Sequence, residues 1–245
     1  MHRVANGCII LNSVQKARTN IMQSENIEIS TSGVKAALKK YDPYSAVAEF
    51  VWNGFDAGAK NVEITYKTNP LGAISELWII DDGVGIPRQE ISHKFKPFLQ
   101  TNKSVDPKAR FEGPSASHGK NGYGRLTFFH FANSAEWMTT YQTREGQYRS
   151  YSITIDAALL NKYTPSQESD SAENATGTKV RFSEVEGLNA DEFPELSKHL
   201  AREFAWFLEL KSPFKRQISI NGKALDYEAL IADEDTSELS FGQHR

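Results

Sequence analysis

Apolar residues recur at helical spacing in two long segments of the chain. In the first segment, three apolar residues lie four positions apart: Val47, Val51 and Phe55. They share one face of a helix, which we expect to begin after the capping residue Asp42, with Pro43 in its first position, and to end at Gly58. In the second segment, 190–211, four residues predict a core-facing stripe: Leu196, Leu200, Phe204 and Phe207.

Shorter helices and several strands complete the pattern. Thr31 or Ser32 can cap a helix that runs to Tyr41, and Pro87 is expected to open a helix over 88–95. Apolar and β-branched residues predict strands at 62–67, 74–80, 137–143, 148–155 and 177–182. An Asn-Gly pair predicts a hairpin within 218–225, residues 125–132 are expected to be buried, and 163–176 should form an exposed polar loop.

Helices therefore alternate irregularly with antiparallel hairpins. This order is typical of an α+β fold rather than of a regular parallel sheet. We predict a two-layer α/β sandwich, in which a mixed, mostly antiparallel sheet carries its helices on one face.

Composition and charge exclude several classes of protein. With 39% hydrophobic and 24% charged residues in 245, the chain has the composition of a globular protein and not of a disordered one. The net charge of −3 provides no broad basic surface, so direct nucleic-acid binding is not indicated. A single cysteine, Cys8, excludes an internal disulfide and a cysteine-rich metal site.

No apolar run reaches the length of a membrane helix, so no membrane association is expected. The N-terminal apolar run is interrupted by Asn6 and Gly7 and makes a poor signal peptide. We therefore expect a cytoplasmic protein, in which Met22 is an alternative start to Met1.

The first predicted helix carries an unusual polar line. Glu49, Asn53 and Asp56 are four and then three positions apart, so they lie on one helix face. A solvated face usually carries Lys and Glu, whereas this one has two acids and a carboxamide beside the small residues Gly54 and Ala57. On this segment alone, a solvated face with chance spacing and a functional site are both open.

The segment DDGVGIP, residues 81–87, follows directly on a predicted apolar strand. Its acids are therefore expected at a strand end, and Gly83 and Gly85 allow the backbone to approach a bulky group closely. A calcium loop would need alternating acids and a distal Glu, which are missing. An ordinary Asp-Gly turn remains the alternative.

The segment GKNGYGR, residues 119–125, has three glycines immediately before the expected buried segment. Such a loop can hold phosphates with its backbone N–H groups. It is not a Walker loop, because Gly113 is one residue too far from Gly119 and Asn121 stands where Ser or Thr is required. A glycine-rich hinge without a ligand is the alternative.

Taken together and in this order, the motifs resemble the GHKL ATPase superfamily. They are Glu-x-x-x-Asn-x-x-Asp-Ala, Asp-x-Gly-x-Gly, a glycine-rich segment that ends in Gly-x-Gly, and the Gly-Thr of 177–178. The superfamily includes DNA gyrase B subunits, the large heat-shock chaperones, sensor histidine kinases and MutL. The resemblance covers roughly residues 40–185, and it implies a Bergerat fold in which ATP is held between helices and sheet under a lid at about 96–124.

The resemblance also implies roles for individual residues. Glu49 would be the catalytic base that activates water, Asn53 the Mg²⁺ ligand, and Asp81 the reader of adenine, a contact that Thr178 would share through a water molecule. The other expected ATP contacts are Asp56, Ala57, Lys60, Gly83, Gly85, Ile86, Lys103, Gly119, Lys120, Asn121, Gly122, Tyr123, Gly124 and Arg125.

Two residues depart from the family pattern. Asp82 stands where many relatives have Asn, and it is expected to add a second negative charge beside the base. Trp52 is bulky for its motif, and it is expected to point away from the ligand.

The implied function is an Mg-ATP-dependent ATPase that dimerises when its lid closes and acts on a client not readable from the sequence. Two alternatives are a histidine-kinase catalytic domain, for which His2 is the only upstream histidine, and an ATP-gated interaction module with little turnover. We expect a possible dimerisation arm at 1–30, the ATP-binding domain at 31–211, and at 212–245 a hairpin and tail that begin a truncated second domain.

Overall fold

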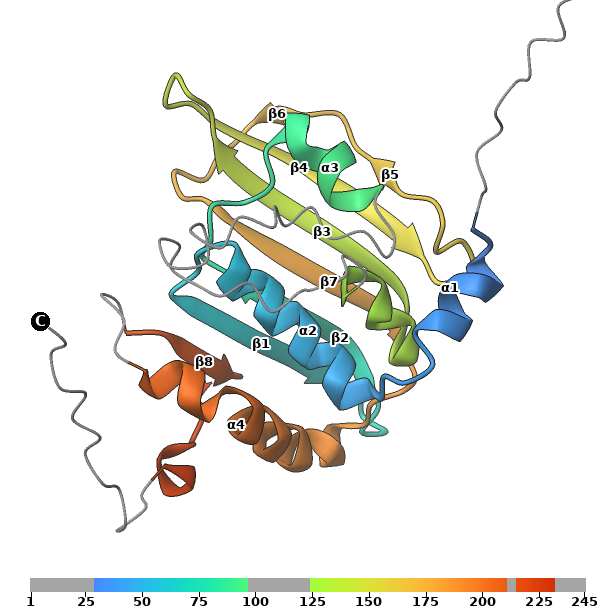
Figure 1. The fold of residues 1–245 in the computed structure, drawn as a ribbon, viewed down its shortest axis with the longest axis vertical. Coiled ribbons are helices and arrows are strands. Elements are labelled where there is room, and N and C mark those ends of the chain that lie inside the picture. Colours follow the sequence, from blue (N-terminus) through green and yellow to red (C-terminus); the bar gives the residue numbers. More distant parts are fainter. Residues whose placement is uncertain (1–28, 97–123, 211–214, 232–245) are drawn as a thin grey trace, which may run out of the picture.

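The computed structural model describes residues 29–96, 124–210 and 215–231. Its centre is one nine-stranded sheet (Figure 1). The strands are β1 (Asn61–Thr68), β2 (Ile74–Asp81), β3 (Ala132–Gln142), β4 (Tyr148–Asp156), β5 (Thr164–Pro165), β6 (Ser169–Asp170), β7 (Gly177–Val185), β8 (Gln217–Ile220) and β9 (Lys223–Ala224).

The strands follow the spatial order β5-β4-β3-β7-β2-β1-β8-β9, and β6 also pairs with β4. Every pairing is antiparallel except that of β1 with β8, which is parallel. The helices lie on one face of this sheet (Figure 1). The predicted fold class, a two-layer sandwich with a mixed, mostly antiparallel sheet, is confirmed.

Helix α2 (Pro43–Asp56) packs on the middle of the sheet and begins and ends as predicted. The Asp42 side chain accepts a hydrogen bond from the Ser45 N–H at 2.8 Å, and Gly58 has a positive φ of 79° just beyond the C-terminus. Its apolar face, which includes Val47, Val51 and Phe55, is buried. The cap and the stripe together set the orientation of α2, and hence that of its polar line.

The other helices cover the remainder of the same face. They are α1 (Thr31–Ala37), α3 (Ile91–Phe95), α4 (Phe193–Glu209) and the 3-10 helices η1 (Arg88–Glu90), η2 (Gly124–His130), η3 (Ala190–Glu192) and η4 (Glu228–Leu230). The cap of α1 is Ser30, whose hydroxyl accepts from the Gly33 N–H, and not Thr31 or Ser32 as predicted. The start of that helix was therefore misplaced by one or two residues, and the helix ends at Ala37 rather than at Tyr41 as predicted.

Aromatic side chains make up much of the core between α2 and the sheet. The ring of Phe50 lies 4.9 Å from that of Phe182, and the ring of Phe131 lies 4.8 Å from that of Phe182. Trp52 points toward α4, where its ring lies 4.4 Å from that of Phe204 and its Nε1–H donates to Glu203 at 3.0 Å. Trp52 therefore packs into the helix layer, which is the direction expected for it.

Two segments differ from the sequence-based expectation. The polar segment 163–176 is not a plain loop, because β5 and β6 within it add to the outer edge of β4. The Asn-Gly hairpin forms as predicted, with positive φ at Asn221 and Gly222, but β8 pairs with β1 of the main sheet. A boundary at 212 therefore does not separate the hairpin from the sheet, because main-chain hydrogen bonds join the two.

No helix among the described residues is long and apolar enough to cross a membrane. The N-terminal extension, most of the segment expected to form the lid, and the C-terminal tail lie outside the described residues.

Candidate functional site

The polar line of α2 places one carboxylate in a half-buried position. Glu49 Oε1 accepts a hydrogen bond from the Tyr41 hydroxyl at 3.0 Å. Burial raises the pKa of Glu49, whereas the Tyr41 hydrogen bond and the nearby Lys40 ammonium oppose this rise. A carboxylate with a raised pKa is a better proton acceptor than an ordinary exposed one.

Asn53 and Asp56 follow on the same helix and are exposed. Among the described residues, the Asn53 side chain makes no hydrogen bond, so its oxygen is available to a ligand. No group of three or more His, Cys, Asp or Glu side chains in the described ranges could form an all-protein metal cage. A single carboxamide oxygen is nevertheless the kind of donor that Mg²⁺ combines with phosphates and water.

Asp81 ends β2 and lies directly against α2. A Cβ atom on Gly54 of the helix would meet the Asp81 Cβ at 3.0 Å, so the helix and the strand end touch. Burial raises the pKa of Asp81 to about 6, although the backbone N–H groups of Gly83 and Thr178 donate to its carboxylate. The half-buried carboxylate thus retains a desolvation cost that further donors would relieve.

A network of hydroxyl groups lies beside Asp81 on the same side of the sheet. Thr139 Oγ1 accepts from the Ile86 N–H at 2.9 Å and lies 3.3 Å from Thr178 Oγ1. The Tyr151 hydroxyl donates to the Ile86 carbonyl at 2.9 Å. Thr139 and Tyr151 were not predicted, although the two-residue period of WMTTYQT would have placed Thr139 inward beside Trp137.

The turn after Asp81 depends on a close backbone approach. Gly85 has a φ of 73°, and any Cβ there would overlap the carbonyl oxygen of Thr140. One residue earlier, the Val84 N–H donates to the Ala57 carbonyl at 3.0 Å, which ties the turn to the end of α2. The glycines were predicted to let the backbone approach a bulky group closely, and in the structure the turn comes close to the backbones of β3 and of the end of α2. This contact fixes Ile86 beside the hydroxyl network.

Asp82 points away from this network. Its Oδ1 accepts from the N–H groups of Lys60 at 2.7 Å and Asn61 at 2.9 Å, and its Oδ2 accepts from Asn61 Nδ2 at 2.7 Å. The carboxylate thus holds the connection between α2 and β1. Its negative charge raises the pKa of Asp81, and the expected effect of Asp82 on a bound base stays a prediction.

The structure brings the beginning of η2 to Glu49. A Cβ on Gly124 would overlap Glu49 Oε2, and the Thr127 hydroxyl donates to the Gly124 carbonyl at 2.7 Å. Arg125 instead reaches α3, where Nη2 donates to the Phe95 carbonyl at 2.8 Å, and burial lowers its pKa to about 10. Its guanidinium is thus engaged by the protein.

The remaining expected contacts divide into two groups. Lys60 is exposed where the chain enters β1, and its backbone serves Asp82. Six expected ATP contacts lie outside the described residues and stay predictions: Lys103, Gly119, Lys120, Asn121, Gly122 and Tyr123.

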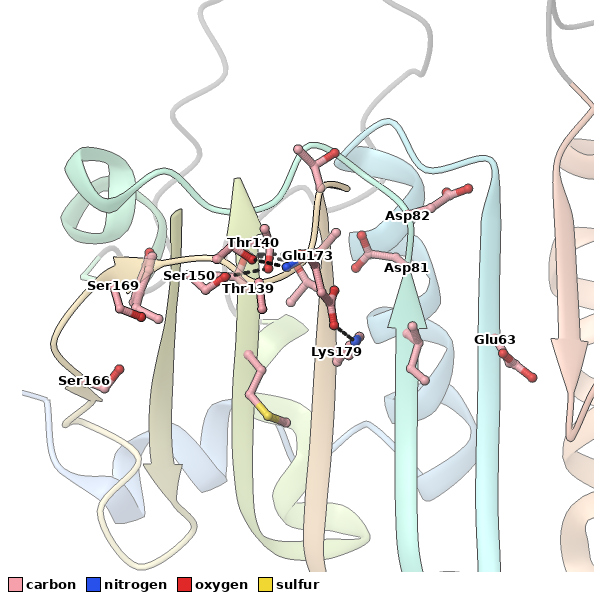
Figure 2. A pocket seen from close by; sticks show the side chains of 18 of the residues that line it. Glu63, Asp81, Asp82, Thr139, Thr140, Ser150, Ser166, Ser169, Glu173 and Lys179 are labelled. Carbon is pink, nitrogen blue, oxygen red and sulfur yellow. Dashed lines mark hydrogen bonds and ion pairs between the residues drawn. The ribbon is translucent and has the colours of Figure 1, made fainter. Parts of the chain in front are cut away.

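A cavity of about 540 Å³ lies across the sheet from α2 (Figure 2). Its lining includes Ile80, Met138 and Lys179, which pair in register and alternate with the inward-facing residues of the same strands. Glu173 and Lys179 form an ion pair of 2.6 Å at its wall (Figure 2). Asp81 and Thr178 also border it, but their side chains belong to the helix-covered face, so we assign the candidate site to that face.

Comparison with solved structures supports the same fold. The ATPase region of Saccharomyces cerevisiae topoisomerase II is 17% identical, with 74% of this chain and 48% of that chain covered and a TM-score of 0.51. The same region bound to dexrazoxane gives 16% identity, 77% and 50% coverage and a TM-score of 0.53. The ATPase and transducer domains of topoisomerase II from Balamuthia mandrillaris are 14% identical, with 77% of this chain and 50% of that chain covered and a TM-score of 0.50.

The chain spans about half the length of these neighbours. No curated protein matches it. The model of one family, described as histidine kinase-, DNA gyrase B-, and HSP90-like ATPase, matches residues 41–178. This range begins at Tyr41, includes α2 and the turn after β2, and ends at Thr178 in β7. Because the match extends over more than half of the sequence, the chain belongs to the histidine kinase-, DNA gyrase B- and HSP90-like ATPases, the GHKL superfamily.

Proposed function

We propose that the chain binds Mg-ATP between α2 and the ends of β2 and β7 and hydrolyses it with Glu49 as the base. The observation that carries this proposal is the contact between Gly54 and Asp81. It brings a half-buried carboxylate with a pKa of about 6 against the helix that carries Glu49 and Asn53. Perturbed carboxylates that converge in this way are typical of functional sites.

Asp81 is proposed to select adenine. Its carboxylate can accept a hydrogen bond from the exocyclic amine of adenine, whereas guanine would present a carbonyl oxygen to the same acceptor. An unmatched pair of buried acceptors is costly, so this one contact discriminates strongly. Thr178 lies beside Asp81 in the paired strand and would share the contact through a water molecule. Ile86, held by Thr139 and Tyr151, would pack on the base.

Asn53 is proposed to hold Mg²⁺ through its side-chain oxygen. The ion, when bound, supplies positive charge that neutralises the phosphates. Glu49 lies one helical turn away and would accept a proton from the attacking water. The water oxygen forms a bond to the γ-phosphorus while the bond from that phosphorus to the bridging oxygen breaks. ADP leaves with the bonding electron pair, and phosphate is released.

We further propose that ATP binding closes the segment at about 96–124 and favours a homodimer, through which the domain acts on a client protein. Membership of the family and the fold shared with topoisomerase II ATPase regions support this proposal. The ATP-binding unit would comprise residues 31–211 together with the hairpin 217–224, because β8 extends its sheet.

Calorimetric titration with Mg-ATP and Mg-GTP, followed by a phosphate-release assay, tests the proposal. We expect ATP to bind at least about tenfold more tightly than GTP, because the lost contact to Asp81 leaves two acceptors facing each other. We also expect phosphate release to disappear in Glu49→Gln. The exposed Glu209 at the end of α4 provides a matched control, and Glu209→Gln should release phosphate at the parental rate.

Three results would each count against the proposal in a different way. Equal affinity for ATP and GTP would remove the role of Asp81. Tight ATP binding without phosphate release above background would leave an ATP-gated module. Parental phosphate release by Glu49→Gln would show that Glu49 is not the base.

A further inference from the structure

Tyr41 lies in the short connection between α1 and α2, immediately before the helix cap Asp42. Its ring is half-buried, and its backbone N–H donates to the Leu38 carbonyl at 3.1 Å. The same Leu38 carbonyl is within 3.0 Å of His130 Nε2 of η2, and the Leu38 side chain is fully buried. The backbone of Tyr41 is therefore held at the end of α1, and the Leu38 carbonyl that holds it also contacts η2.

The two oxygens of Glu49 have different surroundings. Oε1 accepts the hydrogen bond from Tyr41, while Oε2 faces the Cα of Gly124, where a side chain would overlap it. Lys40 adds positive charge nearby, and its Nζ lies 5.3 Å from the centre of the Tyr41 ring. One oxygen is thus held by the protein, and the other is directed to the end of the glycine-rich segment.

We propose that Tyr41 is a positioning residue for ATP hydrolysis, whose hydroxyl orients the Glu49 carboxylate so that Oε2 receives the proton of the attacking water. This inference rests on the proposed role of Glu49 as the base. Tyr41 itself touches neither ATP nor water in the reaction. It acts by removing the rotation of the carboxylate that would otherwise turn Oε2 away from the reacting atoms.

The geometry favours positioning over a purely structural role. A hydroxyl with a purely structural role could donate equally well to a backbone carbonyl. The Tyr41 hydroxyl instead donates to the Glu49 carboxylate on the polar line. A hydrogen bond to a charged acceptor is stronger than one between neutral groups, and it stabilises the ionised form that can act as a base. Misplacement of a reacting group by about 1 Å can cost up to about 100-fold in rate.

The test replaces Tyr41 by Phe in the full chain, which removes one oxygen and leaves the ring. Tyr44→Phe is the matched control, because Tyr44 is on the first turn of α2 and packs against the ring of His199. For both variants, kcat, the ATP dissociation constant by calorimetry and the temperature of unfolding are measured. We expect Tyr41→Phe to lower kcat about tenfold or more with the ATP dissociation constant unchanged, and to lower the unfolding temperature only by the small amount that one lost hydrogen bond costs.

A pH profile of kcat at saturating ATP provides a second readout. Loss of the Tyr41 donor raises the pKa of Glu49, so the acid limb of the profile should move to higher pH in Tyr41→Phe and stay in place in Tyr44→Phe. The other groups that act on the Glu49 carboxylate are Lys40, Asp56 and Glu203, and all are present in both variants.

The outcomes separate this inference from the proposed function. If Glu49→Gln is inactive but Tyr41→Phe shows the parental kcat and acid limb, the role of Tyr41 is overturned and that of Glu49 stands. If Tyr41→Phe weakens ATP binding and lowers the unfolding temperature together with kcat, with no movement of the acid limb, Tyr41 is structural and the inference is wrong. If Glu49→Gln hydrolyses ATP at the parental rate, the proposed function itself fails.

Discussion

The Cα of Gly124 faces the carboxylate of Glu49 so closely that residue 124 has no room for a side chain. A Cβ there would overlap Glu49 Oε2 and would also lie 3.2 Å from Glu49 Cδ. Only glycine therefore fits at this position, because the first residue of η2 lies against the Glu49 carboxylate. This contact joins the end of the glycine-rich segment to the polar line of α2.

Gly124→Ala is therefore expected to displace the Glu49 carboxylate. Turnover should fall about tenfold or more through the displaced carboxylate, because Glu49 contributes to the reaction and not to ground-state binding, and loss of the expected contact of Gly124 with ATP would add weaker binding. Phosphate release and calorimetric affinity measure the two effects. Gly33→Ala is the control, since a Cβ at Gly33 in α1 makes only ordinary contacts of 3.4 Å. Equal turnover in the two alanine variants would contradict a tight contact at Glu49.

Substitutions of Glu49 and Asn53 should differ in their effects on ATP binding and turnover. Glu49→Ala removes the base but no contact to the nucleotide, so ATP binding should persist while turnover falls by roughly 10²–10⁴-fold. Asn53→Ala removes the proposed Mg²⁺ ligand, so it should weaken magnesium-dependent binding as well as turnover. Titrations with and without Mg²⁺ distinguish them. A merely solvated helix face predicts that both variants behave like the parent apart from about 0.5 kcal/mol of stability.

Asp81→Asn should abolish ATP binding and leave the protein folded. The substitution changes little volume, and the new carboxamide oxygen can still accept from the Gly83 N–H, as Asp81 Oδ1 does at 2.9 Å. Its NH2 group, however, would then face the exocyclic amine of adenine. Both groups are donors, so no hydrogen bond forms between them. Calorimetric titration and circular dichroism check the two halves of the prediction. Micromolar ATP affinity in the folded variant would remove Asp81 from adenine recognition.

The same substitution should stabilise the ligand-free protein above pH 6. The pKa of Asp81 rises from an ordinary 3.8 to about 6 on folding, so between these values the folded state keeps a proton that the unfolded state has lost. Stability therefore decreases as pH rises through this window, by up to about 3 kcal/mol, because one pKa unit corresponds to about 1.36 kcal/mol.

Asn carries no such charge, so the difference between Asp81→Asn and the parent should be near zero at about pH 4 and largest above about pH 6. Urea unfolding of both proteins across this range measures it. The comparison cancels the titration of groups that both proteins share. A difference that does not vary with pH would mean that the buried charge of Asp81 is not its source.

Asp82 is expected to matter for stability rather than for nucleotide choice. Asp82→Ala removes three hydrogen bonds to Lys60 and Asn61 and should lower the free energy of unfolding by about 1–3 kcal/mol. The ratio of ATP to GTP affinity should stay that of the parent. Asp82→Asn keeps an oxygen acceptor. Its free energy of unfolding, measured by chemical denaturation, should therefore lie between those of the parent and of Asp82→Ala. A changed ratio of ATP to GTP affinity in either variant would show that Asp82 does contribute to recognition of the nucleotide base.

Local patterns predicted the elements of the fold because each depends on nearby residues. Asp42, Pro43 and Gly58 define α2 by capping and backbone preference alone, and alternation defined β1 and β2. The parallel pairing of β8 with β1 was not predictable in this way. It depends on chain segments far apart in sequence, and a short strand with an Asn-Gly turn has no feature that specifies its neighbour.

The site was predictable where motif residues share one element, and less so where strands meet. Glu49 and Asn53 followed from helical spacing, but Thr139 and Tyr151 come from strands whose register the sequence does not reveal. The hydrogen bonds of Asp82 were not predictable because its partners, Lys60 and Asn61, lie some twenty positions earlier and only the paired turn brings them together. Tyr41 was expected only as a helix end, since nothing local directs its hydroxyl to Glu49.

The pairing of β1 with β8 has a consequence for the order in which the chain folds. Val62 pairs with Ile218, so nearly all of the described chain must be synthesised before β1 acquires this neighbour. Until then the outer edge of β1 presents unpaired N–H and C=O groups, a surface on which strands of other molecules can add. Contacts so distant in sequence also form slowly. The nascent chain therefore exposes this edge of β1 to aggregation until residues 217–220 have been synthesised and have paired with it.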